Sequence, residues 1–267
     1  MIKNPLFLAL ILIFCQEAFS QTNVTLKNSH TEYLIESPEK LYITENYEIV
    51  IHNQAGGRYS VIGDYIDQFK KIKNIKVEVF DQYGDRVKKL RKSDAIEYNF
   101  SSSYEINDSK IVILNPDYAN YPFTVKVELE SEFDGFMALP EWDPQHAYNM
   151  KVEQASLRLI YPEGQEIKLF EHNISKKQEA INEGQIVVDY EVKDLDIVSE
   201  NVNIKKFVEI TPLVKMSPLH FELDGERGSF ESWNTFGEWF LQLNEGRDSL
   251  LSDTKNFLDN LKGSDTE

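Results

Sequence analysis

Five histidines are the residues of this sequence best suited to metal binding, and their spacing argues against a metal site. No two of them are separated by two or four positions, as paired ligands on one strand or helix usually are. No serine lies in the Gly-x-Ser-x-Gly turn that presents a hydrolase nucleophile. The sequence therefore predicts no catalytic residue, no metal site and no cofactor, and we expect a protein that is not an enzyme. The histidines are His30, His52, His146, His172 and His220.

Two short segments share some features with ligand-binding loops. Asp224 to Gly228 contains two glycines but lacks the lysine and the preceding apolar strand of a phosphate-binding loop. Asp81 and Asp85 stand around a glycine, yet the other oxygen ligands of a calcium loop are missing. A β-hairpin turn explains the second segment without a metal ion.

An aromatic, proline-containing loop from Ser131 to Tyr148 is the candidate ligand site. Phe133, Phe136 and Trp142 lie close together in it, and aromatic rings of this kind bind polysaccharides or peptides by stacking. The alternative is that the loop caps one end of a β-sandwich. We favour the alternative because tryptophan is highly buried on average in folded proteins.

The C-terminal part of the chain is the candidate docking surface for a partner. Ser232 is a good N-cap for a helix whose apolar residues recur at helical spacing, and a second helix is expected from Ser252 to Gly263. These helices expose a large apolar area unless another protein surface covers them. The predicted docking residues are Trp233, Trp239, Phe240 and Arg247, and the second helix carries Phe257, Leu258 and Leu261.

The elements that position these residues are mainly β-strands. Phe123 to Glu130 alternates apolar and polar side chains, which is typical of a strand with one face in water. Such strands form antiparallel sheets packed on a second layer. We expect an all-β fold: an antiparallel β-sandwich of about nine to eleven strands, one large or two consecutive, with a short C-terminal helical tail. Other strand candidates are 41–52, 59–69, 75–80, 86–90, 110–114, 150–161, 167–170, 186–192 and 202–210, of which 75–80 and 86–90 form the clearest hairpin.

The predicted organisation has four parts. Residues 1–20 form a signal peptide, 21–148 a first β-sandwich region, 149–228 a second β-sandwich region and 229–267 a helical segment. Gln21 to Lys40 is polar and predicts a loose lead-in that adds at most an edge strand. The signal peptide is indicated by Lys3, an apolar run that is too short to span a bilayer, and a small-x-small cleavage signal that ends at Ser20. We therefore expect an exported protein with no membrane span after cleavage.

The charge of the chain excludes one class of partner. With 45 acidic and 28 basic residues, the formal net charge is -17, and binding to nucleic acid requires clustered cations. One basic group stands out, which we interpret as the solvated face of the predicted hairpin, with an acidic docking partner as the alternative. Its members are Lys70, Lys71, Lys73, Lys76, Arg86, Lys88, Lys89, Arg91 and Lys92.

Several short motifs, taken in order, resemble the DUF3857 family. The resemblance covers roughly residues 33–261, and the order and spacing of the motifs carry it. The motifs are Val79 to Lys89, Asn115-Pro116, Tyr121-Pro122, Leu139 to Trp142, Ser232-Trp233-Asn234, Phe236 to Trp239 and Gly246-Arg247-Asp248. The resemblance implies an exported bacterial module, typical of Bacteroidetes, in the periplasm or on the outer surface of a Gram-negative bacterium.

The resemblance also implies a role. Family members usually continue into a papain-like, transglutaminase-like core with a Cys-His-Asp triad, whereas the sole cysteine here is Cys15, inside the expected signal peptide. We therefore expect the transglutaminase-like domain to be lacking and no residue to carry its activity. The implied role is a noncatalytic module that packs against, or presents substrate to, a transglutaminase- or peptidase-like domain in cis or in trans. The alternatives are a free-standing module that binds a polysaccharide or a peptide, and a fragment without independent function.

Overall fold

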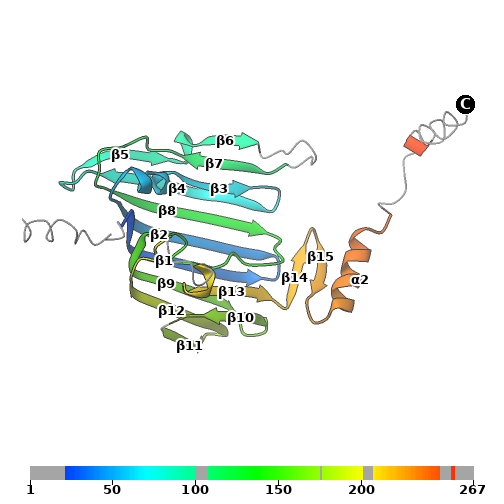
Figure 1. Ribbon diagram of the computed structural model, residues 1–267. Helices are drawn as coiled ribbons and strands as arrows, with labels where there is room; N and C mark the ends of the chain where they lie inside the picture. Colours follow the sequence, from blue (N-terminus) through cyan, green and yellow to red (C-terminus); the bar gives the residue numbers. More distant parts are fainter. Residues whose placement is uncertain (1–21, 100–107, 175, 201–206, 247–253, 256–267) are drawn as a thin grey trace, which may run out of the picture.

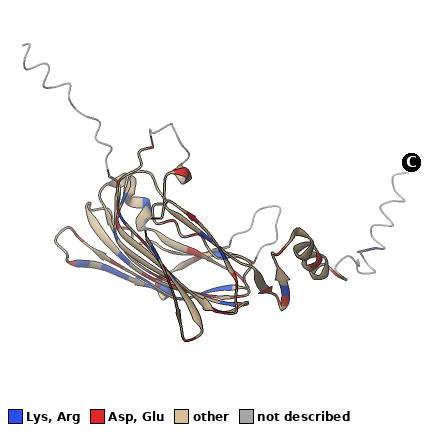
Figure 2. Cartoon of the chain, turned by 90° about the horizontal axis from the view of Figure 1, so that it is seen from below, with Lys and Arg blue, Asp and Glu red and all other residues tan. Residues whose placement is uncertain are grey.

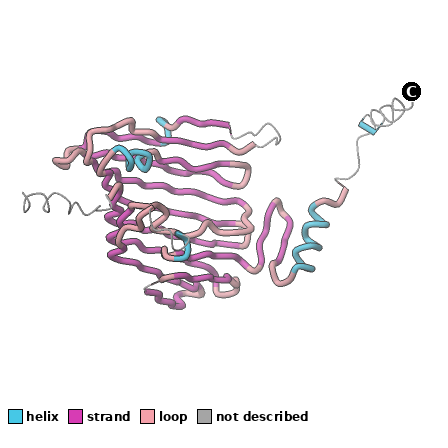
Figure 3. Tube along the Cα trace, viewed as in Figure 1, coloured by secondary structure: helices cyan, strands magenta, loops and turns pink. Residues whose placement is uncertain are grey.

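The computed structural model describes residues 22–99, 108–174, 176–200, 207–246 and 254–255. The predicted signal peptide lies outside the described residues, as do Arg247 and the apolar residues of the second predicted helix. In the part of the chain that is described, no helix is both long enough and apolar enough to cross a membrane. Strands dominate these residues (Figure 3), which confirms the predicted all-β fold.

One large sheet of eight strands organises the molecule (Figure 1). All neighbouring strands in it are antiparallel except β1 and β9, which run parallel. The sheet takes strands from both predicted sandwich regions, so the boundary near residue 148 does not separate two sheets. In spatial order the strands are β11 (Lys176–Asn182), β12 (Gln185–Leu195), β9 (Met150–Pro162), β1 (Val24–Ser37), β2 (Lys40–Ile51), β8 (Phe123–Asp134), β4 (Lys70–Phe80) and β5 (Arg86–Arg91).

The inner face of this sheet is mainly apolar because most inward residues of its central strands are apolar. In β8 the inward residues Phe123, Val125, Val127 and Leu129 are all buried, while the residues between them face outward. Burying one such side chain contributes roughly 1.5–3 kcal/mol, so a one-residue slip of register would be costly. The alternation seen in the sequence therefore determines which face of β8 joins the core.

The outer face of the large sheet is exposed and carries cross-strand ion pairs. Glu132 on β8 contacts Lys40 on β2 at 2.8 Å and Lys73 on β4 at 2.7 Å. In Figure 2, basic and acidic residues lie along the same strands. Lys73 and other members of the predicted basic group lie on this face, but Lys70 is only 5% exposed and points into the protein.

Smaller sheets form the second layer of the sandwich. One part contains β3 (Ile62–Ile66), β7 (Lys110–Leu114) and β6 (Ile96–Asn99), and another contains β10 (Ile167–His172) and β13 (Leu213–Pro218). Their buried residues, such as Val112 and Val214, join those of the large sheet in one hydrophobic core. The chain also forms short 3-10 helices, η1 (Gln54–Ser60), η2 (Lys92–Asp94) and η3 (Phe207–Glu209).

The N-terminal segment differs from the prediction. Instead of a loose lead-in, β1 is a long interior strand that lies between β9 and β2. The alternation of apolar and polar residues in β1 is interrupted by a register shift between Leu26 and Asn28. Directly after the shift, the inward positions hold the small polar residues Ser29 and Thr31, so the sequence there lacks the apolar residues that indicate a buried strand. The predicted strand 110–114 is β7, which pairs with β3 and β6 in the second layer.

The C-terminal part consists of a hairpin and a helix beyond one end of the large sheet (Figure 1). The hairpin contains β14 (His220–Leu223) and β15 (Glu226–Ser229), and the helix is α2 (Trp233–Leu243). Ser232 caps the helix as predicted, because its side chain accepts a hydrogen bond of 3.1 Å from the Thr235 N–H. Trp239 holds α2 on the hairpin by packing edge-on against Phe221, with ring centroids 5.0 Å apart.

Candidate functional site

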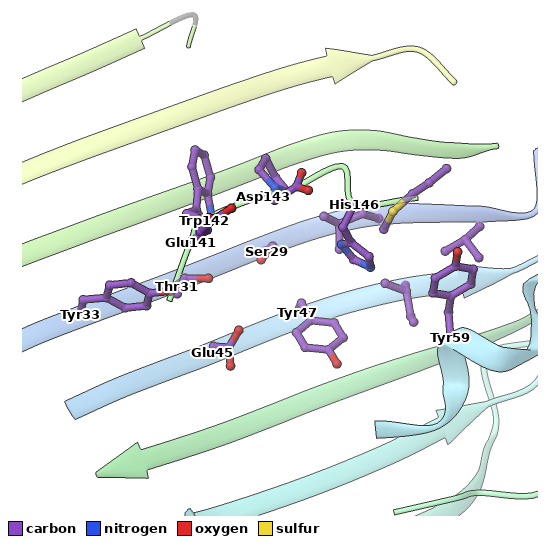
Figure 4. A pocket seen from close by; sticks show the side chains of 15 residues that line it. Ser29, Thr31, Tyr33, Glu45, Tyr47, Tyr59, Glu141, Trp142, Asp143 and His146 are labelled. Atoms are coloured by element: carbon purple, nitrogen blue, oxygen red, sulfur yellow. The ribbon is translucent and has the colours of Figure 1, made fainter. Parts of the chain in front are cut away.

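A cleft opens on the inner face of the large sheet where the second layer leaves β1 and β2 uncovered. It consists of two adjoining cavities of about 230 Å³ and 400 Å³, which share several lining residues. Its roof is the segment 135–149 between β8 and β9, which we call the covering segment (Figure 4). We call this space the β1–β2 cleft. The residues that line both cavities are Tyr33, Glu45, Tyr47, Tyr59, Glu141 and His146.

The cleft exists because small side chains occupy inward positions of β1. Ser29 and Thr31 stand where neighbouring strands place larger residues, such as Leu157 on β9. A position filled by a small side chain leaves a space that only a second layer or a ligand can fill. Trp142 of the covering segment also lines this space, and its ring centroid lies 6.4 Å from that of Tyr190 on β12.

The covering segment is held in place by hydrogen bonds from Trp142 and Gln145, near its middle. Trp142 and Val214 exchange backbone hydrogen bonds of 2.9 Å and 3.0 Å, which attach the segment to β13. The buried Gln145 side chain donates to the Met150 carbonyl at 2.8 Å and to the Asp196 carbonyl at 2.7 Å. The roof of the cleft is therefore a built part of the fold.

Glu45 is the most unusual residue of the cleft. It lies on β2 at an inward position and is half-buried, and its carboxyl group has neither a hydrogen bond nor an ion pair with the described residues. Burial raises the pKa of its carboxyl group, the nearby Asp64 carboxylate raises it further, and the Lys70 ammonium group opposes both effects. Glu45 thus presents a poorly solvated acceptor to the cavity.

A buried ion pair lies at the edge of the larger cavity. Lys70 Nζ is 2.6 Å from Asp64 Oδ1, and it also lies 4.1 Å from the ring centroid of Tyr65 and 5.1 Å from that of Phe133. The ammonium group is therefore neutralised by a carboxylate and further stabilised by two aromatic rings.

Tyrosines form the floor and one wall of the cleft. Burial, followed by the nearby Glu45 carboxylate, raises the pKa of both Tyr33 and Tyr47, so both are neutral phenols that can donate a hydrogen bond. Tyr59 of η1 lies across the cleft, with its ring centroid 6.0 Å from that of His146. The cleft thus offers aromatic faces, hydroxyl donors and carboxylate acceptors to a ligand.

A model of the DUF3857 family, described as a domain of unknown function with a solved structure, matches residues 38–199. The chain belongs to the DUF3857 family. No curated protein matches its sequence.

The fold of this DUF3857 chain is similar to known structures. A crystal structure of a "putative protease" from Parabacteroides distasonis aligns with a TM-score of 0.64 and 13% identity over 91% of this chain. An M1 zinc metallopeptidase from Deinococcus radiodurans also matches, with a TM-score of 0.34 and 9% identity over 79% of this chain. The chain spans 47% of the length of each of these two structures. The first similarity shows the fold that the family member adopts.

Of the three predicted ligand-binding residues, only Trp142 lines the β1–β2 cleft. All three belong to the hydrophobic core, with Phe133 5%, Phe136 4% and Trp142 4% exposed. Sequence reasoning did not select Glu45, Tyr33 or Tyr47. A signal for Glu45 was present, because it occupies an inward position of the alternating strand 41–51, where a charged residue is unexpected.

The predicted docking residues fall into three groups in the DUF3857 chain. Trp233 and Phe240 are 89% and 54% exposed on α2, whereas Trp239 is 5% exposed and packs against the hairpin. Arg247 lies outside the described residues. Within the described part of the chain, no three His, Cys, Asp or Glu side chains are grouped as metal ligands would be.

Proposed function

We propose that this DUF3857 chain is an exported, noncatalytic module that holds a peptide segment in the β1–β2 cleft and presents it to a transglutaminase- or peptidase-like domain. The observation that carries the proposal is the cleft itself. It combines aromatic walls with hydrogen-bonding groups that have no partner within the described protein, which is the usual composition of a binding site.

The exposed face of α2 supports the second half of the proposal. Trp233 is 89%, Leu241 72% and Phe240 54% exposed. Exposed aromatic residues of this kind commonly mark the centre of a protein interface. The similar structure named as a protease is about twice as long as this chain, since the chain spans 47% of it. We propose that the α2 face contacts the following catalytic domain, in the same chain or in another.

A peptide suits the cleft better than a polysaccharide does. Sugar rings stack on broad exposed aromatic faces, whereas Trp142, which belongs to the covering segment, is only 4% exposed. A narrow ligand with polar backbone groups can reach Glu45, Tyr33 and Tyr47 on the floor. A free-standing peptide-binding module remains the alternative, and it differs from the proposal in needing no partner at α2.

Peptide binding is tested by filling the cleft. The mature chain is titrated with a random decapeptide mixture while tryptophan emission is followed, and we expect a saturable change. Ser29→Phe places a large ring on the cleft floor and should abolish the change. Thr44→Phe, on the outer face of β2, is the matched control and should bind as the unaltered protein does. The absence of a saturable change in the unaltered protein would contradict the proposal.

Docking is tested separately with a purified transglutaminase-like domain from a longer DUF3857 protein, using calorimetry. The variant Trp233→Ala/Phe240→Ala should bind it at least about tenfold more weakly, because exposed aromatic residues often dominate an interface. Glu238→Ala, also exposed on α2, is the matched control. Peptide binding without any association with the catalytic domain would favour the free-standing module.

A further inference from the structure

The smaller cavity of the β1–β2 cleft has a one-sided charge. Its lining residues include three carboxylates and neither lysine nor arginine. One of these, Glu141, already pairs with Lys215 at 2.7 Å on the rim. Asp143 accepts a 3.2 Å hydrogen bond from the Gln145 N–H, and Glu45 has no hydrogen bond or ion pair within the described residues. The negative charge of this cavity is therefore incompletely compensated.

Aromatic rings surround the same cavity. Tyr33, Tyr47, Tyr59 and Trp142 line it together with Glu45 (Figure 4). Tyr33 is only 3% exposed, yet its hydroxyl group has no hydrogen-bond partner among the described residues, although it lines the cavity. The hydroxyl group is therefore free to donate a hydrogen bond to a molecule that occupies the cavity. Aromatic faces beside a carboxylate are the environment that an organic cation prefers.

The adjoining cavity already contains an example of this arrangement. The protein's own Lys70 lies over the rings of Tyr65 and Phe133 and pairs with Asp64. The two positive side chains that line the larger cavity are both engaged, since Arg58 donates a 2.8 Å hydrogen bond to the Tyr59 hydroxyl group. Neither of them is among the residues that line the smaller cavity, although Arg58 contacts Tyr59, which lines both cavities.

We infer that the smaller cavity binds an organic cation, namely the ammonium or guanidinium group of a lysine or arginine side chain in the presented peptide. This inference rests on the proposed function and adds a substrate class to it. Glu45 provides the negative charge, and Tyr33, Tyr47 and Trp142 provide the surrounding rings. Asp143 completes the roof.

The electrostatics of the carboxylates agree with a missing cation. Burial raises the pKa of Asp143, the Glu141 carboxylate raises it further, and His146 and the hydrogen bond from Gln145 oppose these effects. Burial and the nearby Asp64 carboxylate likewise raise the pKa of Glu45. A cation between the two groups would stabilise both charged forms.

The test compares four peptides of seven residues that differ only at the central position, which is lysine, arginine, norleucine or glutamate. Binding to the full chain is measured by calorimetry, together with binding of n-butylammonium as a free cation. We expect the lysine and arginine peptides to bind at least about tenfold more tightly than the norleucine peptide, which has the same apolar length without the charge.

Two isosteric variants locate the contact. Glu45→Gln should weaken binding of the lysine peptide by about tenfold or more and leave that of the norleucine peptide unchanged. Glu48→Gln changes a carboxylate on the outer face of the same strand, where it pairs with Lys126 at 3.0 Å, and should have no effect.

The outcomes separate this inference from the proposed function. Equal binding of all four peptides would overturn the cation site and leave peptide binding intact. Binding of n-butylammonium alone would support the cation site and contradict the peptide-presenting role. Failure of every probe to bind would overturn both the cation site and the proposed function. Equal loss of lysine-peptide binding in the Glu45→Gln and Glu48→Gln variants would overturn the cation site alone.

Discussion

Replacing Lys70 tests whether the buried ion pair beside the cleft joins the two layers of the sandwich. Lys70 lies on β4 of the large sheet, and its Nζ is 2.6 Å from Asp64 Oδ1 on β3 of the second layer. The lysine side chain is 6% exposed and that of the aspartate 17% exposed. Lys70→Met keeps most of the apolar stem and removes the charge that neutralises Asp64.

The expected loss of stability depends on which charge of the Lys70–Asp64 pair stays buried after the other is removed. Removing one member of a buried ion pair typically costs about 3–5 kcal/mol, because the other charge stays in a medium of low polarity. Asp64 keeps some contact with water and lies 3.4 Å from Ser131 Oγ. We therefore expect about 3 kcal/mol for Lys70→Met and about 4 kcal/mol for Asp64→Asn, which leaves the more deeply buried ammonium group unpaired. The double variant should cost less than either single variant.

The assay is guanidinium chloride unfolding, followed by tryptophan emission and by far-ultraviolet circular dichroism. A shift in midpoint at constant slope reports a change in the free energy of unfolding. The matched control is Lys110→Met, because Lys110 and Glu97 pair at 3.0 Å with side chains 46% and 50% exposed. Its cost should be at most about 1 kcal/mol. The reasoning would be refuted if Lys70→Met and Asp64→Asn each lowered the free energy of unfolding by less than about 1 kcal/mol. It would also be refuted if the loss in the double variant equalled the sum of the two single losses.

Three further predictions concern one glycine and two carboxylates. A Cβ at Gly228 would clash with Phe221 Cζ, so Gly228→Ala should loosen α2 and speed its proteolysis. Gly237→Ala is the control, because a Cβ there meets no atom within 4 Å, and it should leave the rate of proteolysis unchanged. Equal rates of proteolysis in the two variants would contradict this prediction. The raised pKa of Glu45 means that stability falls as pH rises above the ordinary value of 4.5, so Glu45→Gln should raise the melting temperature at neutral pH but not below that value. Hydrogen bonds from Lys40 and Lys73 lower the pKa of Glu132 to about 2, so Glu132→Gln should lower the melting temperature at neutral pH. The difference in melting temperature between the variant and the unaltered protein should shrink as the pH falls from 4.5 toward about 2, and a constant difference would count against these ion pairs.

The sequence determined the features that depend on near neighbours in the chain. Alternation in 123–130 defined the inner face of β8, and the pattern around Asp81 to Asp85 defined the hairpin of β4 and β5. Ser232 marked the start of α2. These features can be predicted from the sequence because side-chain direction in a strand and capping of a helix depend on residues a few positions apart.

The tertiary structure alone decided where β1 lies and what faces the cleft. β1 pairs with β9 in parallel, in a register that places His30 beside Ser156, far away in the sequence. A pairing between distant segments leaves no local pattern, and the register shift after Leu26 obscures the one that exists. Likewise, Lys70 is indistinguishable in sequence from its exposed neighbours, and its burial follows from Asp64 on another sheet. The cleft brings together β1, β2, η1 and the covering segment, so its composition became visible only when those segments were assembled.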